Sequence, residues 1–403
     1  MYIRSAWVPN ETVHLVRLEE DVEFIGNPQF RDAADEFLRS AHVPALLWEL
    51  AGKPPGWSHR GVRDDNRSVL LTDSRVVIDD REFVACIKGC GSPLDAYEVA
   101  PLTADRLRVL CHDSNLRTRI PSDDGVAPGM LTGERWFGNV PYGGQAPDNA
   151  LIGLTASLRA KGDSIAGFRI CPVLGLVKLP EAFARIASSF YWYRQYHGEY
   201  WEEIRLMPSN VRLYFHSPIT FGIDTGKALG LFEVESLEDA ERFLRRMAGS
   251  ALAALTLFAR TLRADSSTGG YRGLGYHDVW LDKDAVIARD GTMHFADLEG
   301  IEDVPARDPA AVREMIASQF HRNVYEATYA FEALVIEVHR RFRVPGSFRR
   351  RRAWILELLE DAAHADPYVD VERQGEAITA HVAPAVDQGP CGVDLELANT
   401  EAT

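Results

Sequence analysis

The feature that most constrains this sequence is residues 275–300, where aspartates surround two short apolar runs. The segment reads GYHDVWLDKDAVIA, then RDGT, then MHFADLEG. The Asp-Gly dipeptide between the runs predicts a β-hairpin, which brings Asp284, before the first run, and Asp297, after the second, to neighbouring strand ends. Carboxylate oxygens that lie together are suitable ligands for a hard divalent cation. The segment therefore predicts a metal-binding hairpin.

A second constraint is Lys88, which ends the apolar run FVACIK. The run predicts a β-strand whose alternation places Lys88 on one face with Val84 and Cys86. A buried ammonium group needs an anionic partner, because desolvating an unpaired charge is costly. Nucleotide phosphates are one such partner. The alternative is a lysine that extends its ammonium group from the strand end into water.

These segments occur in the order in which protein kinases carry their nucleotide site. In kinases a strand lysine contacts the α- and β-phosphates, and an aspartate after a later strand holds Mg²⁺. A triphosphate with its metal ion needs at least one cation and two oxygen ligands, supplied from separate strands. Lys88, Asp284 and Asp297 supply this set. The sequence thus predicts that ATP and Mg²⁺, or Mn²⁺, bind in a cleft between two lobes.

Composition sets the class of protein. The 403 residues are 46% hydrophobic, which is enough for two packed lobes. The formal net charge of −15 argues against an electrostatic grip on nucleic acid or on an anionic membrane. No apolar run approaches the roughly 20 residues that cross a bilayer, and the start MYIRSAWVPNETVHLV does not have the order of a signal peptide. We therefore expect a cytoplasmic protein that binds neither nucleic acid nor membrane.

The five cysteines are sparse and odd in number, which indicates reduced thiols rather than a disulfide framework. A zinc site that combines Cys86, Cys90, Cys111 and His112 is the alternative. The absence of a CxxC pair argues against it.

The predicted elements fall into a mixed amino-terminal part and a helical carboxy-terminal part. The expected strands lie at 68–89 and 167–179, and the expected helices lie at 148–161, from about 236, at 308–342 and at 347–365. Residues 112–147 are rich in Gly, Pro, Asp and Asn, which is typical of a long loop.

We therefore predict an α+β fold with a bilobal, protein-kinase-like architecture. Residues 1–180 form the small N-lobe, with strands, the long loop and one helix. Residues 181–365 form the mainly helical C-lobe with the catalytic and metal-binding loops. Residues 366–403 form a carboxy-terminal hairpin followed by an acidic, weakly patterned tail.

Three segments resemble the selenoprotein O family, whose members have a protein-kinase-like fold and transfer AMP to protein hydroxyls. KGCGSPLDAY, which begins at Lys88, is similar to the family segment K-G-A-G-x-T-P-Y-S-R. ARIASSF, at residues 184–190, is similar to T-R-V-A-P-S-F, and HDVWLDKD, at residues 277–284, is similar to H-G-V-M-N-T-D-N. The segments occur in the family's order and together comprise 25 of the 403 residues.

The resemblance implies roles for individual residues. Lys88 and Arg185 would contact the nucleotide phosphates, and Asp284 and Asp297 would bind the metal. The stretch GGQAPD is the best match to the region that supplies the acidic partner of the strand lysine, which makes Asp148 the candidate for that partner.

The catalytic loop departs from the family pattern. Lys283 stands where the family has its presumed catalytic aspartate, and Asp284 stands where it has the metal-binding asparagine. A lysine acts as a base only when its pKa is strongly lowered. Either Asp282 or Asp278 takes this role through a shifted loop, or transfer proceeds without a base, or the protein is inactive.

These observations predict an ATP- and metal-dependent transferase that adenylylates, or phosphorylates, a hydroxyl of a protein, a peptide or a small molecule. One alternative is a pseudokinase that serves as a scaffold, which Lys283 favours. Another is a small-molecule kinase, although the usual H-G-D-x-x-x-x-N motif is absent. The acceptor and the oligomeric state stay open.

A run of four arginines, residues 349–352, stands at an expected helix start. We interpret it as a solvated helix face that pairs with acidic residues of this acidic protein. The alternative is a docking site for an acidic partner.

Overall fold

The computed structural model describes residues 12–16, 23–34, 58–63, 68–88, 147–178, 201–209, 211–212, 232, 234–276, 281–298, 300–306, 308–346, 348–374, 377–382 and 393–398. The chain divides into two compact units. The sheet unit comprises Pro9–Leu158 and Cys171–Met207, and the helical unit comprises Met1–Val8, Arg159–Ile170 and Pro208–Thr403. The predicted boundaries after residues 180 and 365 stay predictions.

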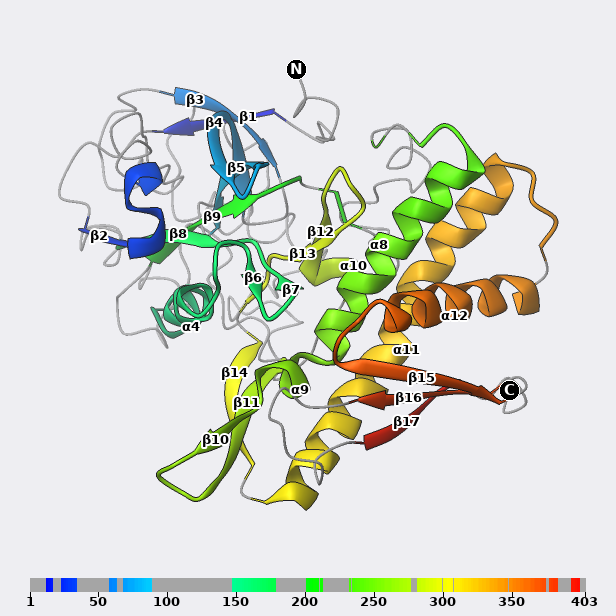
Figure 1. Cartoon of the computed structure of the whole chain (residues 1–403). Helices are drawn as coiled ribbons and strands as arrows, with labels where there is room; N and C mark the ends of the chain where they lie inside the picture. The colour runs from blue at the N-terminus through cyan, green and yellow to red at the C-terminus, as the bar shows by residue number, and fades with distance from the viewer. Residues whose placement is uncertain are drawn as a thin grey trace, which may run out of the picture. The chain divides into compact units, whose positions relative to one another are not determined.

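Within the described residues, the sheet unit is built on a seven-stranded sheet in the order β1-β3-β4-β5-β9-β8-β2. Neighbouring strands are antiparallel throughout (Figure 1). The unit also contains helix α4 (Pro147–Leu158) and the short 3-10 helix η2 (Pro28–Phe30). The strands are β1 (Thr12–Val16), β2 (Glu23–Gly26), β3 (Ser58–Arg63), β4 (Ser68–Ile78), β5 (Arg81–Lys88), β8 (Val173–Lys178) and β9 (Trp201–Met207).

Strands β4 and β5 form an antiparallel hairpin in the region where strands are expected, residues 68–89. The turn residues Asp79 and Asp80 have positive φ angles of 47° and 62°. Tight hairpin turns need this conformation, and aspartate tolerates it. Every residue from Phe83 to Lys88 is buried, so both faces of β5 are covered.

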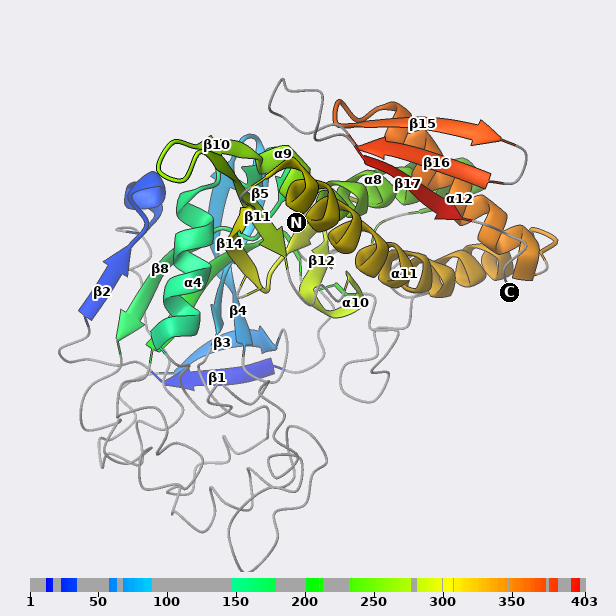
Figure 2. The same ribbon diagram turned by 90° about the horizontal axis from the view of Figure 1, so that it is seen from below.

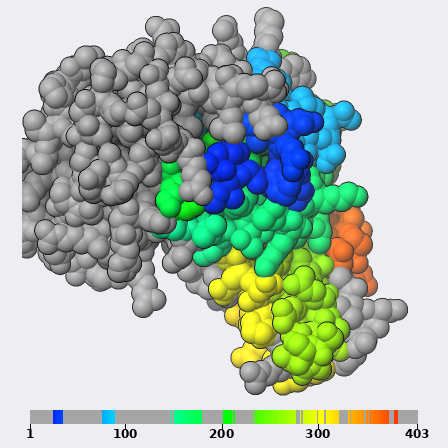
Figure 3. Space-filling view, turned by 90° about the vertical axis from the view of Figure 1, so that its left-hand side faces the viewer, coloured from blue at the N-terminus to red at the C-terminus, as the bar shows by residue number. Residues whose placement is uncertain are grey.

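Helix α4 packs against β8 and β9, and Figure 2 shows it running along β8. Its end is held by the segment around η2. The side-chain Nδ2 of Asn27 donates to the carbonyl oxygen of Val173 at 2.9 Å and to Ser157 Oγ at 3.2 Å. Gln29 Nε2 donates to the carbonyl oxygen of Leu158 at 3.1 Å. Figure 3 shows the segment of β2 and η2 in blue, next to teal-green residues of the range 147–178.

The helical unit combines long helices with small antiparallel sheets (Figure 1). Its helices are α8 (Leu237–Leu255), α9 (Leu257–Thr261), the single turn α10 (Leu281–Asp284), α11 (Pro309–Arg341) and α12 (Phe348–His364). Its described strands pair as β6-β7, β10-β11-β14, β12-β13 and β15-β16-β17. They are β6 (Ser164–Ile165), β7 (Phe168–Arg169), β10 (Arg263–Asp265), β11 (Gly270–Tyr276), β12 (Ala285–Ile287), β13 (Met293–Phe295), β14 (Ile301–Ala306), β15 (Val369–Gln374), β16 (Ala377–Val382) and β17 (Val393–Ala398).

The long helices start where the sequence predicts, because capping residues stand there. Ser236 and Asp239 form a reciprocal capping box at α8, with Ser236 Oγ accepting the Asp239 amide at 3.0 Å. The carboxylate of Asp308 caps α11 by accepting the amides of Ala310 and Ala311, and Pro309 occupies the first turn, where no amide is needed.

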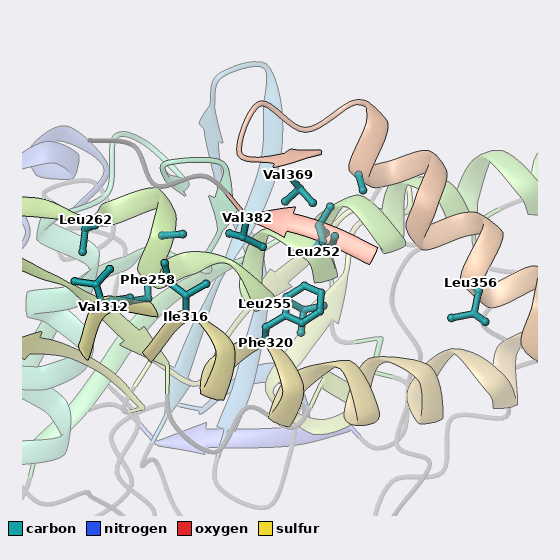
Figure 4. Close-up of a cluster of buried hydrophobic side chains, with 13 residues drawn as sticks. Leu252, Leu255, Phe258, Leu262, Val312, Ile316, Phe320, Leu356, Val369 and Val382 are labelled. Carbon is teal, nitrogen blue, oxygen red and sulfur yellow. The ribbon is translucent and has the colours of Figure 1, made fainter. Parts of the chain in front are cut away.

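The core of the helical unit joins its helices to the sheet of β15 and β16 (Figure 4). Phe258 of α9 and Phe320 of α11 are fully buried at its centre. Nearby, the Phe258 amide donates to Gln319 Oε1 at 2.9 Å, which satisfies a backbone group near the start of α9. The cluster consists of Leu252, Leu255, Phe258, Ala259, Leu262, Val312, Ile316, Phe320, Leu356, Ala363, Val369, Ala380 and Val382.

The coarse prediction of an α+β fold with antiparallel sheets and several helices is confirmed. Nearly all of the predicted loop at 112–147 lies outside the described residues. In the described part of the chain, no helix combines the length and the apolar character that a membrane span requires.

The predicted acidic tail is wrong for residues 393–398. The hairpin of β15 and β16 is confirmed, but β17 adds a third strand that pairs antiparallel with β16, with Val393 opposite Val382. Val393 and Leu395 alternate with acidic residues, which is a strand pattern. The acidic composition of the segment concealed this alternation.

Candidate functional site

The β12–β13 hairpin places Asp284 and Asp297 at neighbouring strand ends. Ala285 lies opposite Phe295 in its register. The carbonyl oxygen of Asp284 accepts the amides of Ala296 at 2.7 Å and of Asp297 at 3.3 Å. The backbones of the two aspartates are therefore directly connected, as the sequence predicts from the Asp-Gly turn.

Aromatic residues support the backbone of Asp297. Tyr276, at the end of β11, donates its hydroxyl to the carbonyl oxygen of Asp297 at 2.5 Å. Its ring meets that of Phe295 edge to face, with centroids 5.5 Å apart, and Phe168 stacks on Phe295 at 4.7 Å. Asp297 is thus held at its amide by Asp284 and at its carbonyl by Tyr276, which limits the positions open to its carboxylate.

A buried polar pair anchors the hairpin from the side. Ile170 forms a parallel bridge with Phe295. His294 Nδ1 lies 3.3 Å from the carbonyl oxygen of Ile170 and 3.9 Å from Asp163 Oδ2, and both the His294 and Asp163 side chains are fully buried. Arg169 pairs with the other carboxylate oxygen of Asp163 at 2.5 Å. These contacts join residues 159–170 to β13.

The donor set suits a hard cation rather than zinc. Asp284 is 5% exposed and Asp297 is partly exposed. Among the residues that the structure describes, no group of three or more histidines, cysteines and acids converges on one point. Mg²⁺ is commonly held by one or two carboxylates together with waters and substrate phosphates, whereas structural zinc takes four protein ligands. Two aspartates at the neighbouring strand ends of one hairpin are the residue types of the first kind of site.

In the sheet unit, Lys88 is buried, with 2% of its surface exposed. The alternative in which its ammonium group reaches water is therefore wrong, because β5 is covered on both faces. The strand register places Lys88 opposite Ser68 of β4 and opposite Glu203 of β9. Residues opposite each other in antiparallel strands carry their side chains on the same face.

Glu203 and Arg205 form a buried ion pair on that face. Arg205 Nε lies 2.7 Å from Glu203 Oε1, and the two side chains are 3% and 2% exposed. A Cβ atom at Gly153 of α4 would lie 2.5 Å from Glu203 Oε2. The carboxylate therefore lies between the sheet and α4, and a glycine makes the space for it. Lys88, Glu203 and Arg205 share one face, with two positive charges and one negative charge.

Glu203 and Arg205 are not among the residues predicted from the sequence. The available signal was the segment WEEIRLM, an otherwise apolar strand that carries charges. Asp148, the acidic partner expected for Lys88, lies in the first turn of α4, and its side chain is outside the described part of the structure. Glu203 is the acid that the register places opposite Lys88.

Glu202, the residue before Glu203, lies on the opposite face of β9. It is fully buried, and neither carboxylate oxygen has a hydrogen-bond partner in the described structure. Burial raises the pKa of Glu202 well above its ordinary value. This glutamate therefore favours the neutral, protonated form.

The remaining predicted site residues are not placed. Arg185 and Asp278 lie outside the described residues. Asp282 and Lys283 belong to the turn α10, but their side chains are not described.

Among known proteins, no protein-family model and no curated protein matches this chain.

Proposed function

We propose that this protein is an ATP- and Mg²⁺- or Mn²⁺-dependent transferase with a bilobal, protein-kinase-like fold. It transfers AMP, or phosphate, to a hydroxyl group of a protein, a peptide or a small molecule. The observation that carries the proposal is the β12–β13 hairpin, which joins the backbones of Asp284 and Asp297 at neighbouring strand ends. Kinases hold their metal ions with two side chains in this arrangement along the chain.

The chain order in the sheet unit also supports the proposal. Strand β5 ends in Lys88, helix α4 follows, and β8 and β9 then return to the sheet so that β9 lies beside β5. In kinases a strand lysine pairs with a glutamate on the helix that follows it. Here α4 packs over the face that carries Glu203, opposite Lys88. In this proposal Glu203, from a strand, orients the lysine.

The predicted residues divide into those that contact the nucleotide, those that bind the metal and those that act on the acceptor. Lys88 and Arg185 contact the phosphates, and Asp284 and Asp297 hold the divalent ion, which neutralises phosphate charge when bound. Tyr276 keeps Asp297 in place through its backbone carbonyl. Asp282 or Asp278 accepts the proton of the acceptor hydroxyl.

A second candidate is a nucleotide-binding pseudokinase that serves as a scaffold. The observation that favours it is Lys283, which stands at the presumed position of the catalytic aspartate. A small-molecule kinase is a third candidate, distinguished by phosphate rather than AMP transfer.

Two measurements test the proposal. In a thermal shift assay, ATP with Mg²⁺ at 100 times its dissociation constant should stabilise the protein by about 2.7 kcal/mol. Asp297→Asn should lose the Mg²⁺-dependent part of this shift, whereas the control Asp361→Asn, at an exposed position of α12, should keep it. No shift with either metal would contradict nucleotide binding.

Labelled ATP then separates the candidates. Label transferred from the α-phosphate means adenylylation, and label transferred from the γ-phosphate means phosphorylation. Nucleotide binding without transfer of either label identifies the scaffold.

A further inference from the structure

The connection between α11 and α12 is strongly basic. Residues 339–352 read HRRFRVPGSFRRRR, and no acidic residue occurs from 338 to 356. This contrasts with the net charge of −15 for the whole chain. We call residues 339–352 the arginine corner, which joins the end of α11 to the start of α12 in the helical unit (Figure 1). Its exposed arginines are Arg340, Arg341, Arg343, Arg349 and Arg350, of which Arg340 already pairs with Glu337 through two hydrogen bonds of 2.7 Å.

The positive charges at the start of α12 oppose the helix dipole. Arginines in the last turn of α11 are favourable, because a helix carboxy-terminus attracts cations. The first turn of α12 contains arginines and no acidic residue, although a helix amino-terminus favours negative charge. The amino-terminal end of α12 therefore combines a positive dipole end with guanidinium groups, and both attract an anion.

A buried histidine lies within the arginine corner, at the end of α11. His339 is 7% exposed, and its ring stacks on Trp354 of α12 with centroids 5.1 Å apart. Its Nδ1 has no hydrogen-bond partner in the described structure. A Cβ atom at Gly346 would lie 2.3 Å from this nitrogen, so Nδ1 faces the connection between the two helices.

Charge at the corner also acts on this histidine. Burial, and then the charges of Arg351 and Arg350, lower the pKa of His339 below its ordinary value. The lowered pKa favours the neutral form of the ring, so His339 adds little to the positive charge of the corner.

We propose that the arginine corner is a docking site for an acidic segment of a protein partner. Carboxylate or phosphate groups of the segment pair with the exposed guanidinium groups at the start of α12. Arginine suits such groups because its planar fork makes two parallel hydrogen bonds to one carboxylate or phosphate. This site does not depend on the proposed transferase activity.

Net charge favours a short peptide segment over a nucleic acid or a membrane. Charges act over about 8 Å at physiological ionic strength, so a short segment experiences mainly the corner itself. An extended polyanion would also approach other surfaces of a chain whose net charge is −15.

Binding of fluorescein-labelled octaglutamate, measured by fluorescence anisotropy at about 0.15 M salt, tests the proposal. The double variant R349Q/R350Q should bind the peptide about tenfold more weakly, or worse, because each lost guanidinium removes a charge-assisted contact. The control R242Q/R263Q removes the same charge from two other exposed positions of the helical unit. It should bind within about twofold of the wild type.

Several results would overturn the docking site. Absence of octaglutamate binding by the wild type is one, and an equal loss in both double variants is another, since the effect would then be one of net charge alone. Tighter binding of an oligothymidylate or of phosphatidylserine vesicles would assign the corner to a nucleic acid or to a membrane. Circular dichroism of all variants confirms that they are folded.

Discussion

The two faces of strand β9 differ in the partners that they offer to a buried glutamate. On one face, Glu203 pairs with Arg205 and lies opposite Lys88. On the other face, Glu202 is surrounded by protein and has no hydrogen-bond partner in the described structure. The residues are consecutive and of the same type, and both are buried. The neighbours therefore decide whether a buried glutamate is ionised.

The difference shows how the physical cost of burial is met. A buried carboxylate that faces cations keeps its charge, because its partners replace water. A buried carboxylate without partners takes up a proton, because desolvation disfavours the charged form. Lys88, Glu203 and Arg205 therefore depend on one another for burial, and removing one of them affects the other two.

The largest effect is expected when the paired face loses its acid. Glu203→Leu leaves Lys88 and Arg205 as buried cations, so we expect a loss of about 3–5 kcal/mol in the free energy of unfolding. Urea unfolding monitored by circular dichroism measures it. The double variant E203L/R205L should recover part of this loss, because it removes a buried charge together with its partner. A loss below about 1 kcal/mol for the single variant would show that the pair is not structurally important.

Replacing the glutamate on the other face should change the free energy of unfolding in the opposite direction. Glu202→Leu replaces an unsatisfied buried carboxyl with an apolar group, and we expect it to stabilise the protein by about 1–3 kcal/mol. Urea unfolding at neutral pH measures this change. Destabilisation by Glu202→Leu would show that the two faces do not differ as described.

The pH dependence of Glu202 sharpens the same comparison. Its folded pKa lies above the unfolded value of about 4.3. Between these values the folded protein holds a proton that the unfolded chain releases, so stability falls as pH rises through this window. Glu202→Gln cannot titrate at this position. The Tm of the variant minus the Tm of the wild type should therefore be constant below pH about 4 and should increase above it, because only the wild type loses stability there. A constant difference across pH would contradict a raised pKa.

A final prediction concerns the glycine that makes room for Glu203. Gly153→Ala puts a methyl group within 2.5 Å of Glu203 Oε2, and we expect a loss of about 1–3 kcal/mol from overpacking. Gly249→Ala, in α8, has no atom within 4 Å of the added carbon, and it should stabilise by up to about 1 kcal/mol through helix propensity. Thermal unfolding compares the two. Equal gains would show that the Glu203 carboxylate moves aside freely.

Local patterns predicted much of the fold. The capping box at Ser236, the Asp-Gly turn between β12 and β13, and the alternation in β4 and β5 each depend on neighbours in sequence, and each element is present. The β17 strand was missed because its pattern is short and its composition is acidic. Its pairing with β16 depends on a segment more than ten residues away along the chain.

The candidate site divides in the same way. Asp284 and Asp297 could be paired from the sequence, because one hairpin turn connects them. Glu203 could not be paired with Lys88, because the order β5-β9 in the sheet brings together strands more than a hundred residues apart. Helix α4 lies between the two strands in the chain, and the sequence-based prediction assigned the acidic partner of Lys88 to Asp148 of this helix rather than to a residue of β9.

The sequence by itself determined where helices, turns and strands begin, since propensity, capping and alternation act over a few residues. It also determined which residues carry charge within apolar runs. Tertiary structure alone decided which of these charges meet. Long-range strand pairing placed Glu203 opposite Lys88 and Glu202 on the other face of β9, and packing of α12 on α11 stacked His339 on Trp354. Such contacts depend on the register and packing of distant segments.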